Sequence, residues 1–217
     1  MLFRTVLWLA SLAFTPVTGQ AMEATVINDT LILSGPVIQG DIQRFNEAVA
    51  ANPAISTVVL RNSWGGHVES GYRIGERIRE KGLTTVVSGH CVSSCSRMFL
   101  GGKERRFSDD YSLERTFVGF HGHYDDNGQL NRALVERFGL LKWIIKYSDG
   151  KADRDLVQRW INIELNTGMV AIMHPYGQKI PNAGPRSLHS LPRSRPGHLF
   201  GCPGPEAELL AQVPVFA

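Results

Sequence analysis

Short β-branched runs alternate with helical patterns along most of this 217-residue chain, and that alternation constrains the fold more than any other feature. The runs that predict strands cover residues 30–34, 55–61, 84–88 and 116–121. The patterns that predict helices cover residues 41–51, 68–81, 93–100, 129–147 and 153–165. Because parallel strands must be joined by crossovers, which are usually helices, the alternation predicts an α/β fold with a largely parallel sheet.

The first 21 residues are typical of a secretory signal peptide. Arg4 precedes an apolar run at 5–14, and Gly19-Gln20-Ala21 places small residues where signal peptidase cleaves. The run is shorter than the roughly 20 residues that span a bilayer. We therefore expect the mature chain to begin near Met22, to be periplasmic or secreted, and to have no stable membrane span after cleavage. An uncleaved anchor or a buried first helix is the alternative.

The rest of the chain divides into a domain at 22–175 and a tail at 176–217. The tail is rich in Pro, Gly and Ser, which predicts an irregular tail or a partner-binding arm, with a brief helical pattern only at 205–212. Hydrophobic residues make up 43% of the chain and charged residues 20%, as in ordinary globular proteins.

Charge and cysteine content narrow the function classes. The formal net charge is +3, and loss of Arg4 with the signal peptide would lower it by one. This small charge and the lack of a basic stripe argue against nucleic-acid binding. Cys91, Cys95 and Cys202 form an odd set, so at least one thiol lies outside any intramolecular disulfide, and the sequence leaves the pairing open.

Three segments carry residues suited to acyl transfer. Gly65 and Gly66 follow a strand and precede a helix, where exposed amides can hold an oxyanion. Ser93 lies where the next strand passes into a helix, a position that favours a nucleophile because of the helix dipole. His121 ends the strand at 116–121 and can act as the base. Together they supply an oxyanion turn, a nucleophile and a base.

These segments resemble those of the Clp protease proteolytic subunits. Residues 62–66 (Asn-Ser-Trp-Gly-Gly) resemble that family's Asn-Ser-Pro-Gly-Gly turn, with Trp64 in place of proline. Residues 89–94 resemble its nucleophile segment, and residues 119–121 resemble its Met-Ile-His. The likeness covers about residues 57–126. The Cys-x-Ser-x-Cys frame around Ser93 is closer to a group of exported Clp-like proteins than to Clp itself.

The resemblance implies a fold, an activity and a set of site residues. The fold is a Clp/crotonase-like spiral of ββα units, and the activity is that of a serine peptidase or related hydrolase that assembles into a homo-oligomer and needs no cofactor. Ser93 is the implied nucleophile and His121 the implied base, with the amides of Gly66 and Ser94 as oxyanion donors. Peptides or proteins are the implied substrates.

Two assignments stay open within this interpretation. The family's triad aspartate lies beyond a long helix, where this chain has Glu164 and Asn166, either of which is a candidate to orient the histidine. Asp153 and Asp155 are interpreted instead as the cap of a helix. Ser94 is the nucleophile if the alignment slips by one residue.

Three other functions compete with the hydrolase. Without a clear triad acid, the domain is a candidate binding scaffold that lacks catalysis. His121 and His123, with His90 or Asp125, are candidate zinc ligands, although no metal site is expected. An acyl-CoA enzyme shares the crotonase fold, but that substrate is cytoplasmic and the signal peptide argues against it.

Overall fold

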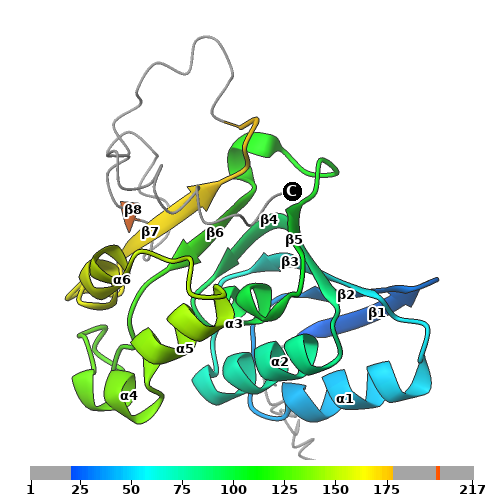
Figure 1. The fold of residues 1–217 in the computed structure, drawn as a ribbon, viewed down its shortest axis with the longest axis horizontal. Coiled ribbons are helices and arrows are strands. Elements are labelled where there is room, and N and C mark those ends of the chain that lie inside the picture. The colour runs from blue at the N-terminus through cyan, green and yellow to red at the C-terminus, as the bar shows by residue number, and fades with distance from the viewer. Residues whose placement is uncertain (1–20, 178–198, 201–217) are drawn as a thin grey trace, which may run out of the picture.

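A computed structural model describes residues 21–177 and 199–200 of the chain. In that part, eight strands form a sheet in the order β1-β2-β3-β4-β6-β7-β8, and β5 pairs with β4 off this path (Figure 1). The strands are β1 (Glu23–Ile27), β2 (Thr30–Ser34), β3 (Thr57–Ser63), β4 (Thr84–Val92), β5 (Arg105–Phe107), β6 (Phe117–Phe120), β7 (Gly168–Met173) and β8 (Leu199–Phe200).

The central strands run parallel, as the alternation predicted. β2, β3, β4 and β6 form successive parallel pairs, and β5 is also parallel to β4. β1 joins β2 and β7 joins β6 in the antiparallel sense. In β2 and β3 buried residues alternate with half-buried ones, so one face of these strands is covered more completely than the other.

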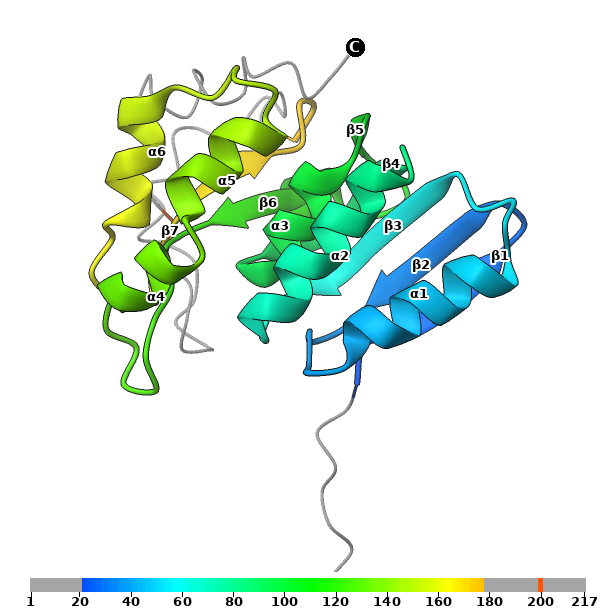
Figure 2. The ribbon, with the colours of Figure 1, turned by 60° about the horizontal axis from the view of Figure 1, so that its bottom comes forward.

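Helices α1, α2 and α3 lie together on one face of the sheet (Figure 2). Amphipathic spacing explains the covering, because α1 buries Phe45 and Val49, and α2 buries Ile74 and Ile78. The helices are α1 (Asp41–Ala51), α2 (Val68–Glu80), α3 (Ser94–Gly101), α4 (Arg132–Arg137), α5 (Leu140–Tyr147) and α6 (Arg154–Ile161), with a 3₁₀ turn η1 (Leu113–Arg115).

The predicted α/β class is confirmed, and several boundaries differ from the prediction. The helix predicted at 129–147 is two helices, because Gly139 adopts a left-handed conformation (φ 55°) between α4 and α5. The helix predicted at 153–165 ends at Ile161. β4 extends to Val92, beyond the predicted 84–88, and β3 begins at Thr57 rather than at residue 55.

Four strands, β1, β5, β7 and β8, were missing from the prediction. β1 is mostly exposed, so its sequence lacks a buried stripe; a two-residue turn at Asn28 (φ 55°) and Asp29 folds it onto β2. β7 is a six-residue apolar run introduced by Gly168, which is a strand signal that the prediction did not use.

The predicted signal peptide lies almost wholly outside the described residues, as do most of the predicted tail, its helical pattern at 205–212 and Cys202. Among the residues that the structure describes, no helix has the length and apolar character to cross a bilayer.

Candidate active site

Ser93 occupies the junction between β4 and α3 in a backbone conformation that side chains rarely adopt. Its φ is 57° and its ψ is −124°, and its amide donates to the Gly119 carbonyl of β6 (3.1 Å). Such a conformation costs on the order of 1–3 kcal/mol and recurs where a strand turns sharply into a helix to present a nucleophile. Ser93 makes no side-chain hydrogen bond that caps α3. The strained junction therefore does not serve to cap the helix.

Ser94 differs from Ser93 in exposure and direction. Ser93 is half-buried, whereas Ser94 is only 4% exposed, and its Oγ has no hydrogen-bond partner among the described residues. A Cβ built on Gly71 of α2 would lie 2.6 Å from the Ser94 Cβ, so the Ser94 side chain packs against α2. Of the two serines, Ser93 is the more accessible to a substrate.

The Gly65–Gly66 turn packs directly on the Ser93 junction. A Cβ on Gly65 would approach the Ser93 Cβ to 2.8 Å and the Ser94 amide nitrogen to 2.9 Å. Gly65 and Gly66 both have positive φ values, 85° and 142°. Val37 holds the turn through two backbone hydrogen bonds: its carbonyl accepts from His67 N (2.7 Å), and its amide donates to Gly65 O (2.9 Å). In the described part of the chain, no hydrogen bond uses the amide of Gly66 or of Ser94 as a donor. Both amides therefore remain candidate donors to an oxyanion.

Trp64 introduces an exposed aromatic ring at the same turn. It is 40% exposed, and its ring lies 4.0 Å from that of His90, measured between centroids. The ring of Phe117 lies 6.3 Å from Trp64. Trp64 therefore forms an aromatic surface next to the glycine turn.

His121 follows β6, and the sheet register brings it near Ser93. Val92 pairs with Gly119 across β4 and β6, so the two strands end at the same edge, with Ser93 and His121 just beyond them. His121 is 8% exposed, and its Nδ1 lies 2.7 Å from the Gly122 carbonyl oxygen. Since a carbonyl only accepts, Nδ1 carries the proton and the neutral ring presents Nε2 as the acceptor. No hydrogen bond between Ser93 and His121 occurs among the described residues.

Burial keeps His121 neutral. The pKa of His121 is lowered from 6.5 to about 4, chiefly because the ring is removed from water. The nearby charge of Arg97 lowers this pKa further, whereas the hydrogen bond to Gly122 O raises it. The pKa of His123 falls to about 3, again chiefly through burial and then through Arg97 and His121. Tyr124, whose ring lies 5.0 Å from that of His121, has its pKa raised by burial to about 12. All three side chains are uncharged at neutral pH.

Neither candidate for the third triad position contacts His121 among the described residues. The Glu164 side chain is 67% exposed and pairs with Arg132 (2.7 Å). Asn166 packs against Gly128, where an added Cβ would lie 2.7 Å from the Asn166 Nδ2. Asp153 caps α6, as expected, by accepting from Leu156 N (2.7 Å). The group that contacts His121 Nδ1 is the main-chain carbonyl of Gly122, which no side-chain pattern in the sequence reveals.

Arg97 is a site residue that the sequence analysis missed. It lies on α3 and is 1% exposed, and its guanidinium donates to Ser96 Oγ (2.6 Å) and to the His121 carbonyl (2.8 Å). Ser96 in turn donates to the Ser93 carbonyl through Oγ (2.6 Å) and N (3.0 Å). The available signal was a single charged residue in the otherwise uncharged, largely apolar helix that follows Ser93.

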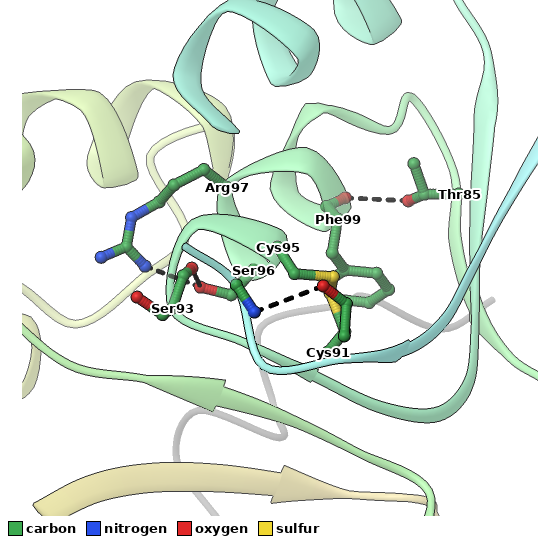
Figure 3. The surroundings of a disulfide bond; sticks show 9 residues. Thr85, Cys91, Ser93, Cys95, Ser96, Arg97 and Phe99 are labelled. Atoms are coloured by element: carbon green, nitrogen blue, oxygen red, sulfur yellow. Dashed lines mark hydrogen bonds between the residues drawn. A yellow bond between two sulfur atoms is a disulfide. The ribbon is translucent and has the colours of Figure 1, made fainter. Parts of the chain in front are cut away.

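Cys91 and Cys95 form a disulfide that closes a five-residue segment around Ser93 (Figure 3). Both cysteines are fully buried, one in β4 and the other in the first turn of α3. The sequence had left this pairing open. The bond joins the strand and the helix on either side of the strained serine, so it restricts the movement of the junction.

The zinc alternative gains no support from the side-chain positions. In the part of the chain that the structure describes, no three His, Cys, Asp or Glu side chains come together as a ligand set. His123 Nε2 lies 3.0 Å from the Tyr72 hydroxyl, so this ring nitrogen is already engaged in a hydrogen bond.

Comparisons with known proteins gave matches among solved structures. No protein-family model and no curated protein matches the chain. ClpP1 from Listeria monocytogenes is similar in structure, with 17% identity and a TM-score of 0.48 over 64% of this chain and 81% of that one. A mutant of the same protein has 17% sequence identity and a TM-score of 0.47, and the match covers 61% of this chain and 78% of that one. A mutant of the 1510-N membrane-bound stomatin-specific protease has 12% sequence identity and a TM-score of 0.47, and the match covers 69% of this chain and 73% of that one.

Proposed function

We propose that this chain is an exported serine hydrolase that cleaves peptide or protein substrates and works as a homo-oligomer without a cofactor. Ser93 is the nucleophile, His121 is the general base, and the amides of Gly66 and Ser94 stabilise the oxyanion. The observation that carries the proposal is the strained, half-buried Ser93 at a strand-to-helix junction, with the Gly65–Gly66 turn packed on it.

The reaction follows from the roles of these groups. His121 Nε2 accepts the Ser93 Oγ proton while Oγ attacks the substrate carbonyl carbon. The negative charge on the carbonyl oxygen is stabilised by the two amides and by the amino end of α3. The imidazolium then returns its proton to the leaving amine, which leaves an acyl group on Ser93. Water, deprotonated by the same histidine, releases the acid and restores the serine.

The Gly122 carbonyl takes the orienting role that a triad acid usually has. By accepting from Nδ1 it fixes the tautomer in which Nε2 is the base. A carbonyl carries no net charge, so it stabilises the imidazolium less than a carboxylate would. We accordingly expect activated esters to be cleaved faster than amides, because their leaving groups need less help from a protonated histidine.

A fluorophosphonate probe tests the proposal. The native protein should gain one adduct per chain in its intact mass and lose hydrolysis of an activated ester in parallel, and heat-denatured protein should gain none. Each oligomeric state separated by gel filtration should be tested. Absence of both labelling and hydrolysis in every state would overturn the proposal and support the catalytically inactive scaffold.

Export is a separate expectation with its own measurement. The signal-peptide pattern of residues 1–21 motivates it, and the Cys91–Cys95 disulfide fits an oxidising compartment. Protein recovered from the periplasm or the medium should have an intact mass that begins near Met22. Recovery only from the cytoplasm, at a mass that still includes Met1–Ala21, would contradict export.

A further inference from the structure

We propose that Arg97 is a positioning residue of the Ser93–His121 pair, because its guanidinium links the two residues through hydrogen bonds and places a buried positive charge beside His121. This inference rests on the proposed function. Figure 3 shows the Arg97 side chain extending over the side of α3 on which Ser93 lies.

Arg97 connects the nucleophile to the base through hydrogen bonds. One arm of the guanidinium donates to Ser96 Oγ, which donates to the Ser93 carbonyl, and the other arm donates to the His121 carbonyl. A single planar group therefore links the backbone of the nucleophile to the backbone of the base. The two residues come from different elements, and a shift of about 1 Å between reacting groups can cost about 10²-fold in rate.

Among the described residues, the charge of Arg97 has no carboxylate as a counter-ion. The side chains that act on it are those of Tyr72 and Tyr124, and its Nε has no hydrogen-bond partner. A buried guanidinium stays protonated at neutral pH, and apolar residues of similar volume can often replace buried charges without loss of stability. Stability alone therefore does not account for this arginine, whereas a role at the adjacent site does.

The charged and titratable surroundings of His121 single out Arg97. Arg97 approaches from α3, and His123 and Tyr124 belong to the same segment as His121. Tyr72 of α2 is connected through its contact with His123. Glu164 follows α6 and is paired with Arg132. Both tyrosines and His123 are neutral at pH 7, so Arg97 is the one charged group of this set that is buried beside His121. A positive charge disfavours the imidazolium, so removal of Arg97 should raise the His121 pKa above its value of about 4.

Two substitutions of Arg97 separate charge from connection. Arg97→Met removes both the positive charge and the hydrogen-bonded link between Ser93 and His121. It is expected to lower kcat for an activated ester by about 10²-fold, with little change in KM. It should also raise the acid limb of kcat/KM above pH 4, while the burial of His121 keeps that limb below 6.5. Arg97→Lys keeps the charge but not the two-armed guanidinium, so kcat should fall while the acid limb stays low.

Arg105→Met is the matched control, because Arg105 is also a buried arginine (4% exposed) that donates to carbonyls, those of Leu100 and Tyr147. Its charge is paired with Asp149 and it contacts neither Ser93 nor His121 among the described residues. This variant should lower thermal stability yet leave the pH profile unchanged.

A measurement that needs no turnover completes the test. The His121 ring protons can be titrated by NMR in the Ser93→Ala background, with and without Arg97→Met, so the electrostatic effect is measured even if the proposed hydrolysis fails. If Arg97→Met does not fold, Arg97→Lys and Ser96→Ala, which cuts the link to Ser93, replace it and should each lower kcat. An unchanged His121 pKa without Arg97, or a kcat within about twofold of wild type in the folded variants, would overturn the inference.

Discussion

Ser93→Ala is expected to abolish hydrolysis, with a loss of turnover on the order of 10⁴- to 10⁶-fold, the scale seen when a serine nucleophile or its partner is removed. The fold should hardly change. The Ser93 side chain makes no capping hydrogen bond to α3, so its removal should alter the free energy of unfolding by about 1 kcal/mol or less. Turnover of a chromogenic ester, together with a thermal melt, measures both effects.

Ser94→Ala is the matched control, one residue away and the same chemical change. The Ser94 hydroxyl is buried without a hydrogen-bond partner among the described residues, so its removal should be neutral or slightly stabilising. Most of the activity should survive because the Ser94 amide, which is the proposed oxyanion donor, remains. Activity that survives in Ser93→Ala and disappears in Ser94→Ala would identify Ser94 as the nucleophile.

His121→Ala should lower kcat/KM by about 10²- to 10⁴-fold, the range for a positioned acid or base. His123→Ala is expected to cost far less in rate. His123 is buried and bonds to the Tyr72 hydroxyl (3.0 Å), so its loss should appear mainly as lower thermal stability. A chelator should leave wild-type activity unchanged, because the proposed oxyanion donors are backbone amides.

The pH profile adds an independent test of His121. The ring is active as a base only when neutral, and its pKa lies near 4, so kcat/KM should stay high down to about pH 5 and fall as the pH drops through about 4. An ordinary exposed histidine would give an acid limb near 6.5. Equal losses in the His121 and His123 variants, combined with loss on chelation, would favour a metal site over the proposed mechanism.

The sequence predicted the central part of the fold because local signals and tertiary packing agree there. Residues 30–101 alternate strand and helix with clear boundaries, such as the glycine that follows Lys81, and the observed elements match within a few residues. Gly65 and Gly66 were interpretable for the same reason, since a sharp turn between strand and helix requires positive φ. Prediction failed where a single residue overrode the pattern, as Gly139 does between α4 and α5.

The candidate site could be predicted only as far as its proposed chemistry lies in side chains with a recognisable spacing. Ser93, His121 and the glycine turn fall on such spacing, and the parallel register of β4 and β6 explains why the serine and the histidine share one edge of the sheet. The group that contacts His121 Nδ1 is a backbone carbonyl, which leaves no trace in the sequence. Arg97 appeared only as one charge in an apolar helix, and its bond to the His121 carbonyl depends on tertiary packing.

Mapping the fluorophosphonate adduct on the wild-type protein tests the central claim most directly. The labelled protein is digested, and tandem mass spectrometry locates the modified residue within the disulfide-closed segment Cys91–Cys95 after reduction. We expect one adduct per chain, on Ser93. An adduct on Ser94 or on any residue outside this segment, or hydrolysis that persists in the fully labelled protein, would contradict the proposed mechanism.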